Sequence, residues 1–193
     1  MRYIIHLLPA EEQRRTYDDL RARIAAAIGP NRALDYPGAH VTLVWAIQDA
    51  PGDPMPIDPA ALIAALEAEC GSGLLPLATR DDVHTREHIL FPLLDTPALA
   101  ALRHRLYLAA RTVAAGPDGT RTDRADRVRE QTWPHLTFAQ EIDAARWERG
   151  MAILAAAGPQ LREPVLGSEL ALVARDIEAG EPYRIIWRGS LVG

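Results

Sequence analysis

The stretch His135-Leu136-Thr137-Phe138, together with its near copy His40-Val41-Thr42-Leu43, decides how the chain is interpreted. Each is a His-x-Thr triplet in a short apolar run with β-branched or aromatic neighbours, which predicts a β-strand. Because side chains alternate between the two faces of a strand, His and Thr two positions apart point the same way, roughly 7 Å apart. The residues between them then face a core. Two strands that each present an imidazole beside a hydroxyl indicate a candidate active site.

Hydrophobic periodicity and turn signals predict the elements around these two strands. In the first half we expect a strand at 2–8, an amphipathic helix at 11–28, a strand at 39–47 and a helix from 59 to Gly71. Two strands at 74–80 and 87–94 follow, on a hairpin. In the second half we expect a helix at 97–116, a polar loop at 118–131, a strand at 133–140 and a helix from 143 to Gly158. Strands at 165–175 and 183–192 end the sequence.

The two halves repeat one order of elements: strand, helix, Gly-Pro, loop, His-x-Thr strand, capped helix, strand. Such a repeat suggests an internal duplication. We therefore predict a single α+β domain of two pseudo-symmetric lobes, about 1–86 and 87–193, with strand exchange between them left open. Each lobe is expected to be a mainly antiparallel sheet with helices on its outer side. The two His-x-Thr strands would then meet at one central cleft.

Composition excludes several classes of protein. A chain of 193 residues with 48% hydrophobic content is long enough to fill a proper core. Its net charge of -5 argues against an extended nucleic-acid surface, although a nucleotide or an RNA end remains a candidate ligand. All 21 basic residues are arginine, which excludes chemistry that needs a lysine nucleophile.

Sequence features also bear on where the protein is found. The single Cys70 permits no internal disulfide and fits a reducing compartment. The apolar run at 3–8 is too short for a signal peptide, and no stretch is long enough to span a membrane. We therefore expect an unanchored cytoplasmic protein. The oligomeric state is left open.

The paired motif resembles the hallmark of the 2H phosphoesterase superfamily, two His-x-Thr/Ser-x motifs about a hundred residues apart. Both quoted stretches match it, and Trp133-Pro134 resembles the frequent aromatic-Pro lead-in to the second motif. Within the superfamily the chain looks like the LigT-type branch of 2′,5′-RNA ligases and cyclic phosphodiesterases. The sequence departs from that branch after each motif, where Val44-Trp45-Ala46 and Ala139-Gln140 stand. The departures leave the exact substrate open.

The resemblance implies cyclic phosphodiesterase or related chemistry without a metal or other cofactor. Opening a 2′,3′-cyclic phosphate requires one group that takes a proton from water and another that gives a proton to the leaving ribose oxygen. His40 and His135 would supply this pair, since imidazole suits both roles near neutral pH. The hydroxyls of Thr42 and Thr137 would donate hydrogen bonds to the non-bridging oxygens. Which histidine begins protonated is left open.

Two aromatic residues beside the motifs are candidates for substrate binding. Tyr36 and Trp133 would stack a base, as aromatic side chains do for single-stranded nucleic acid. Packing in the core or at a sheet edge is the alternative for both.

Two charged segments have a plain and a functional interpretation. The segment 121–130 alternates Arg with Asp and Glu, which is typical of a solvated loop or short helix, while a substrate lid with a phosphate-binding Arg is the alternative. Asp81, Asp82, His84 and His88 are expected to be surface residues of the hairpin, with a metal site as the alternative.

Three alternatives compete with the main hypothesis. In the simplest, the two histidines are ordinary strand residues without a catalytic role. In the second, the chain would be a non-catalytic nucleotide- or RNA-binding module that keeps the cleft. In the third, it would be a 2H-like enzyme that hydrolyses a non-nucleotide phosphoester.

Overall fold

The computed structural model describes residues 1–49, 53, 55–79, 87–158, 161 and 164–192. The α-helices are α1 (Glu11–Ile28), α2 (Pro59–Glu67), α3 (Pro97–Ala115), α4 (Thr122–Ala125) and α5 (Ala144–Ala156), and η1 (Arg32–Asp35) is a 3₁₀ turn. The strands are β1 (Arg2–Pro9), β2 (Val41–Gln48), β3 (Leu75–Leu77), β4 (His88–Pro92), β5 (Arg129–Glu130), β6 (His135–Gln140), β7 (Val165–Arg175) and β8 (Arg184–Ser190).

Capping residues and apolar stripes fix the helices where the sequence predicts them. α1 buries the predicted stripe that includes Tyr17, Leu20 and Ile24. α3 begins with Pro97 directly after Thr96, whose hydroxyl accepts a hydrogen bond from the backbone N–H of Leu99 at 3.3 Å. These local signals lie entirely within each segment, so no distant contact is needed to set the helix ends.

All described strand pairings are antiparallel, and the strand order is β3-β7-β1-β2-β6-β4, with β5 on β2 and β8 on β7. β2 and β6 share the single residue pair Val41 and Leu136. The sheet is therefore continuous but joined narrowly at its middle. This narrow junction lies between the two His-x-Thr motifs.

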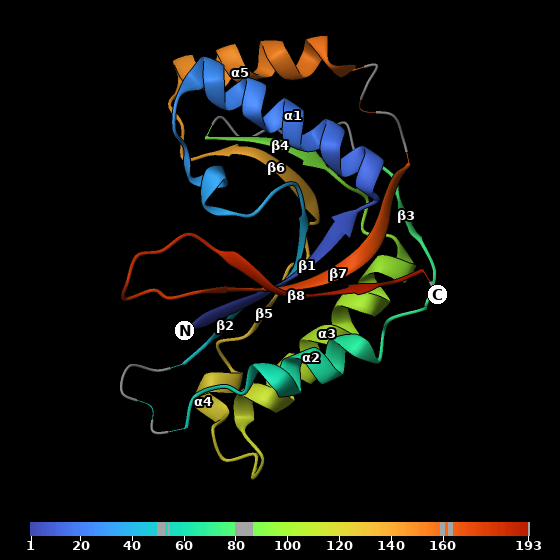
Figure 1. Ribbon diagram of the computed structural model, residues 1–193, viewed down its shortest axis with the longest axis vertical. Helices are drawn as coiled ribbons and strands as arrows, with labels where there is room; N and C mark the ends of the chain where they lie inside the picture. The colour runs from blue at the N-terminus through green and yellow to red at the C-terminus, as the bar shows by residue number, and fades with distance from the viewer. Residues whose placement is uncertain (50–52, 54, 80–86, 159–160, 162–163, 193) are drawn as a thin grey trace.

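The helices cover the outer sides of two lobes (Figure 1). α1 and α5 pack together, with α1 on β6 and α5 on β4, while α2, α3 and α4 lie against the larger group of strands that contains β1, β2 and β7. The predicted α+β architecture with antiparallel strands is confirmed. Each lobe combines elements from before and after residue 86, because β1 pairs with both β2 and β7. The duplication itself stays a prediction.

Three local expectations were wrong. β3 and β4 do not form a hairpin: β3 pairs with β7 and β4 with β6, and a single bridge between Thr79 and Leu93 links their ends. The predicted polar loop at 118–131 contains α4, which fits the short helix expected as one possibility there, and also β5, which was not expected. Cys70 lies in the turn after α2 rather than on its last helical turn. The first two errors share a cause, because pairing with a strand far along the chain leaves no local periodic signal.

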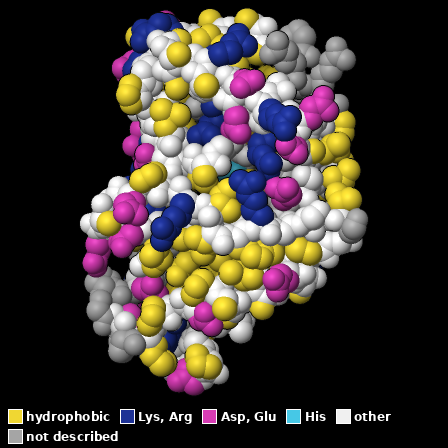
Figure 2. Space-filling view, viewed as in Figure 1, with side chains coloured by type: hydrophobic (Ala, Val, Ile, Leu, Met, Phe, Trp, Pro, Cys, Tyr) yellow, Lys and Arg dark blue, Asp and Glu magenta, His cyan; other side chains and the backbone are white. Residues whose placement is uncertain are grey.

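Within the part of the chain that is described, no helix is long and apolar enough to cross a membrane. Figure 2 shows one face of the molecule, on which the coloured arginine and acidic side chains are interspersed rather than gathered by sign.

Candidate active site

One cleft of about 240 Å³ lies where the two His-x-Thr strands meet, and all four motif side chains line it. His40 directly precedes β2 and Thr42 lies at its start, while His135 and Thr137 come from β6. The cross-strand pair of Val41 and Leu136 holds the two motifs side by side. Those two residues are fully buried on the other face, as strand alternation requires.

Each of the two imidazoles is held by a hydrogen bond from Nδ1 to the carbonyl oxygen two residues earlier in the chain. Nδ1 of His40 lies 2.9 Å from the carbonyl oxygen of Gly38, and Nδ1 of His135 lies 2.8 Å from the carbonyl oxygen of Trp133. A carbonyl oxygen only accepts hydrogen bonds, so Nδ1 carries the proton in the neutral form of each ring. This leaves Nε2 of each histidine as the nitrogen that accepts or donates a proton in chemistry.

His40 is the more enclosed of the two histidines, with 8% of its surface exposed. The ring of His6 stacks on it at a centroid distance of 3.7 Å and an interplanar angle of 9°, and Tyr36 leans on it at 5.1 Å and 40°. The pKa of His40 is lowered to about 4, chiefly by burial; the hydrogen bond to the Gly38 carbonyl raises it, and the nearby Arg21 and His135 lower it. His40 is therefore neutral at pH 7.

His135 has a more open environment. Its described aromatic neighbour is Trp133, at a centroid distance of 4.9 Å and an angle of 45°. Burial lowers the pKa of His135 below its ordinary value, the hydrogen bond to the Trp133 carbonyl offsets part of this, and His88 lowers it slightly more. The two motifs thus share one hydrogen-bonding pattern but differ in how tightly the ring is packed.

The loop before His40 is held by α1. Asp18 accepts a hydrogen bond from the backbone N–H of Ala39 at 2.6 Å, and the buried Arg21 donates hydrogen bonds to the carbonyls of Ala33 and Tyr36. Gly38, whose carbonyl binds His40, has a φ of +98°, which favours glycine. A Cβ there would lie 3.2 Å from the Asp18 carboxylate, so the carboxylate and the turn fit only around glycine.

The departure from the LigT-type sequence after the first motif coincides with a bulge that shapes the cleft. Ile5 pairs with Val44 and Tyr3 with Ile47, so β2 has one more residue than β1 in this interval. Ala46, in the bulge, has a φ of 58° and lines the cleft next to the exposed Trp45. The residues that differ from the branch pattern therefore form part of the wall.

Several cleft residues were missed by the sequence analysis. Two of them are basic, Arg2 on β1 and Arg32 on η1. Arg2 donates a hydrogen bond from Nε to Gln48 at 2.8 Å, and Arg32 forms an ion pair with Glu141. The other polar or aromatic residues that sequence reasoning missed are Gln131, Gln140 and Tyr183. Strand alternation places Arg2 on the same face of β1 as His6, but His6 carries no motif, so no sequence pattern marked Arg2.

The two aromatic candidates have different positions. Tyr36 lines the cleft and stacks on Tyr183 with centroids 4.7 Å apart and an interplanar angle of 8°. Trp133 contacts the ring of His135 but is not among the residues that line the cleft. Tyr36 is therefore placed to meet a ligand directly, and Trp133 is placed to support a histidine.

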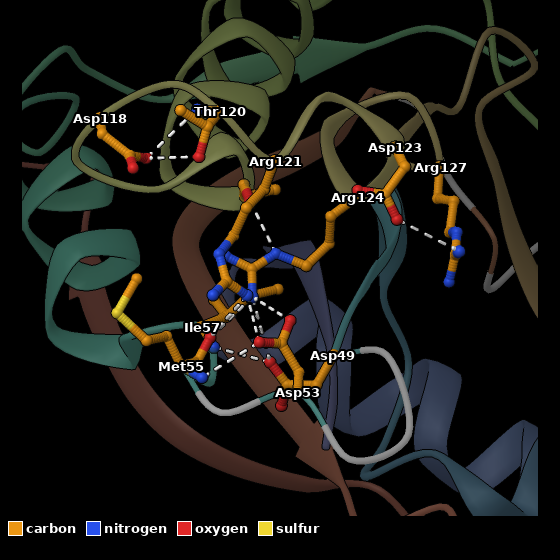
Figure 3. Close-up of polar contacts among 11 residues, drawn as sticks. Asp49, Asp53, Met55, Ile57, Asp118, Thr120, Arg121, Asp123, Arg124 and Arg127 are labelled. Atoms are coloured by element: carbon orange, nitrogen blue, oxygen red, sulfur yellow. Dashed lines mark hydrogen bonds and ion pairs between the residues drawn. The ribbon is translucent and has the colours of Figure 1, made fainter.

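Two arginines of the segment 121–130, Arg121 and Arg124, point toward Asp53 (Figure 3). Arg121 pairs with Asp53, and Arg124 lies 3.0 Å from the same carboxylate and donates to the carbonyls of Ala114 and Met55. None of the residues at 121–130, all of them described, lines the cleft. These contacts give Arg121 and Arg124 a role in holding Asp53 and Met55 in place.

The metal alternative falls largely outside the described residues, since Asp81, Asp82 and His84 lie there. His88, which is described, accepts a hydrogen bond at Nδ1 from the backbone N–H of Glu141 at 3.4 Å. Among the described residues, no group of three or more His, Cys, Asp or Glu side chains is placed to hold a metal ion.

Comparison with known proteins identifies the fold. No protein-family model and no curated protein matches the sequence. Solved structures do match over the whole chain. TT0787 of Thermus thermophilus superposes with a TM-score of 0.56 at 16% identity, covering 100% of this chain and 99% of that protein. E. coli LigT, in a complex with 3′-AMP, superposes with a TM-score of 0.51 at 17% identity, covering 100% of this chain and 98% of LigT.

The chain has the fold of LigT. A protein described as a phosphoesterase superposes comparably, with a TM-score of 0.54 at 16% identity and coverage of 100% and 99% of the two chains. The fold that the resemblance to the 2H phosphoesterase superfamily implied is confirmed. At this level of identity, the LigT fold gives the arrangement of elements, and the chemistry must be argued from the residues of the cleft.

Proposed function

We propose that the protein is a metal-independent phosphoesterase that opens the 2′,3′-cyclic phosphate of a nucleotide or RNA end, or acts on a 2′,5′ linkage. The observation that carries this proposal is the pair of imidazoles in one cleft, each fixed through Nδ1 and each beside its own threonine. The LigT fold supports it, and LigT itself binds 3′-AMP, a nucleotide with a ribose 3′-phosphate. We also propose a cytoplasmic location, in keeping with the single Cys70.

The chemistry needs one neutral and one protonated imidazole. The neutral Nε2 takes a proton from water while the water oxygen forms a bond to phosphorus. The bond from phosphorus to one ribose oxygen breaks, and the protonated Nε2 gives its proton to that oxygen. The hydroxyls of Thr42 and Thr137 donate hydrogen bonds to the non-bridging oxygens as negative charge grows on them. In ligation the same two histidines exchange roles.

Binding of the substrate would raise the pKa of one histidine, which would then take up a proton from solvent. Both histidine pKa values lie below the ordinary value because the rings are buried. A phosphodiester monoanion placed between the rings favours the charged form of either imidazole, and so raises its pKa. The anion would therefore prepare one histidine as the acid.

Arg2 and Arg32 would hold the anionic substrate in the cleft. Both arginines line the same cleft as Tyr36. Guanidinium groups bind phosphate oxygens through charge-assisted hydrogen bonds. The stacked rings of Tyr36 and Tyr183 would provide an apolar wall for the base.

The direct test is turnover of 2′,3′-cyclic nucleotides and of 2′,5′-linked dinucleotides by the purified protein in EDTA. We expect hydrolysis of at least one of these substrates, with the product phosphate position read by chromatography. Full activity in the His40→Ala, His135→Ala double variant would contradict the proposal. Tight nucleotide binding in calorimetry without turnover would instead favour a binding module, and turnover of other phosphoesters alone would favour a non-nucleotide substrate.

Removing the cleft arginines is expected to weaken substrate binding. Arg2→Gln and Arg32→Gln should each raise KM about tenfold, the loss expected for a hydrogen bond to a charged group, with a smaller effect on kcat. The matched control is Arg111→Gln, an exposed arginine on α3 that pairs with Asp126 outside the cleft. If the KM values of Arg2→Gln and Arg32→Gln both equalled those of Arg111→Gln and the wild type, neither cleft arginine would bind substrate.

A further inference from the structure

A third histidine lies behind the first motif. His6 is in the middle of β1, paired with Thr42 across the strands, and 1% of its surface is exposed. Its ring lies nearly parallel to that of His40, with centroids 3.7 Å apart. His6 does not line the cleft, so any effect of His6 on a reaction there is transmitted through its contact with His40.

Packing alone is a poor reason for a histidine at this position. Nε2 of His6 is buried and has no hydrogen-bond partner among the described residues. A buried polar atom without a partner destabilises the folded state, whereas leucine or phenylalanine would fill the same space without that cost. Burial and the nearby His40 also hold the pKa of His6 well below its ordinary value, so the ring is neutral. His6 therefore makes the folded state less stable than an apolar residue would. This cost indicates that the imidazole ring of His6 has a functional role.

The stacked ring completes the restraint on His40. His6 covers one face of His40, Tyr36 leans on the ring at 5.1 Å, and the Gly38 carbonyl binds Nδ1. A turn of the His40 ring about its Cβ–Cγ bond would break the stack and the hydrogen bond together. Of the ring's two nitrogens, Nε2 is the one that these contacts leave for proton transfer.

The second motif has no counterpart to this stack. In the described structure His135 contacts one aromatic ring, Trp133, at an angle of 45° and not face to face. The difference is therefore specific to His40 and does not follow from the His-x-Thr motif itself.

We propose that His6 is a positioning residue for His40, whose stacked ring fixes the plane of the His40 imidazole and keeps water from one of its faces. The proposal rests on the proposed function, because it assigns His6 a part in proton transfer by His40. The other groups that face His40 are Tyr36, Arg21 on α1 and His135 on β6. His6 acts beside them and makes no contact with substrate.

The experiment compares three substitutions at one position. His6→Phe keeps a flat ring, His6→Leu fills the space without one, and His6→Ala removes the stack. We expect His6→Phe to keep kcat within about threefold, and His6→Leu and His6→Ala to lower it about tenfold to a hundredfold with KM little changed, since small displacements of reacting groups have effects of this size. The control is Ile5→Val, which trims the neighbouring residue on the opposite face of β1.

The second readout is the titration of His40 by NMR, followed at its Cε1 proton without substrate. In the wild type, His40 should titrate near pH 4. In His6→Ala it should titrate closer to its ordinary value of about 6.5, because water reaches the uncovered face. His6→Phe should also be more resistant to heat than the wild type, since the unpartnered nitrogen is gone.

The proposal is overturned if His6→Leu has the kcat of His6→Phe and neither His6→Leu nor His6→Ala changes the His40 titration. Should His6→Ala not fold, the comparison of Phe with Leu decides the matter. Absence of turnover in the wild type would refute the proposed function alone, because the titration reports on His40 without any reaction.

Discussion

Replacing either motif histidine by glutamine is expected to lower kcat about 10²- to 10⁴-fold, the range that proton transfer by a positioned side chain contributes. Glutamine is polar and close to imidazole in size, so it preserves the cleft while removing the titratable nitrogen. KM should change much less, because Arg2 and Arg32 remain in place to bind the anion. Steady-state kinetics of His40→Gln and His135→Gln on one cyclic nucleotide measure both quantities.

The double variant gives a sharper result than either single variant. When two groups act in one proton-transfer step, the losses of rate caused by removing each of them are not additive. The His40→Gln, His135→Gln double variant should therefore have a kcat only slightly below that of the slower single variant. The matched control is His104→Gln, an exposed histidine beside Glu130 on the outside of the lobe. If one single variant kept wild-type kcat, the paired acid-base mechanism would be wrong for that histidine.

The pH profile of kcat/KM is expected to have its maximum on the acid side of pH 6.5. Catalysis needs one proton on the histidine pair, and the pKa of His40 is about 4 while that of His135 is lowered by burial. A lowered pKa means that the ring holds its proton only at lower pH. Above the higher of the two pKa values, the singly protonated form and kcat/KM fall about tenfold per pH unit. Between pH 7 and pH 9 the loss should approach a hundredfold.

The profile of kcat should differ from that of kcat/KM. It reports the enzyme with substrate bound, where the phosphate anion raises the pKa of the protonated histidine. We therefore expect its falling limb at higher pH, with circular dichroism checking that the protein stays folded at each pH. A kcat/KM that increased from pH 7 to pH 9 would contradict the assignment of a histidine as the acid.

The bounds of the long helices could be predicted from local sequence far better than those of the short strands. α1 begins and ends at the predicted residues because its apolar stripe, its acidic first turn and Gly29-Pro30 all lie in one segment. β7 likewise has its predicted bounds, and it contains the apolar run from Leu170 to Ala174. β3 and β5 contain three and two residues, and their partners β7 and β2 lie about 90 residues away along the chain. Such short strands have no periodicity to detect, so their pairing was not predicted.

The candidate site was predictable only where it has a motif. The repeated His-x-Thr pattern led to the four residues that line the cleft, and Tyr36 was found because it precedes the first motif. His6, Arg32 and Tyr183 belong to other elements and carry no pattern of their own. They reach the cleft region through strand register and the turn of η1, and register between distant strands is a property of the folded chain.

The pairing of β1 with β7 has a consequence for how the protein is made. β1 lies at residues 2–9 and its neighbour β7 at 165–175, and the two pair along the whole length of β1. A growing chain on the ribosome thus carries β1, with His6 on it, through most of synthesis before β7 exists. One edge of an apolar strand stays exposed in that interval, a state prone to misassembly. Rapid pairing of β1 with β2 would protect the other edge, so the first motif should fold early and the complete cleft last.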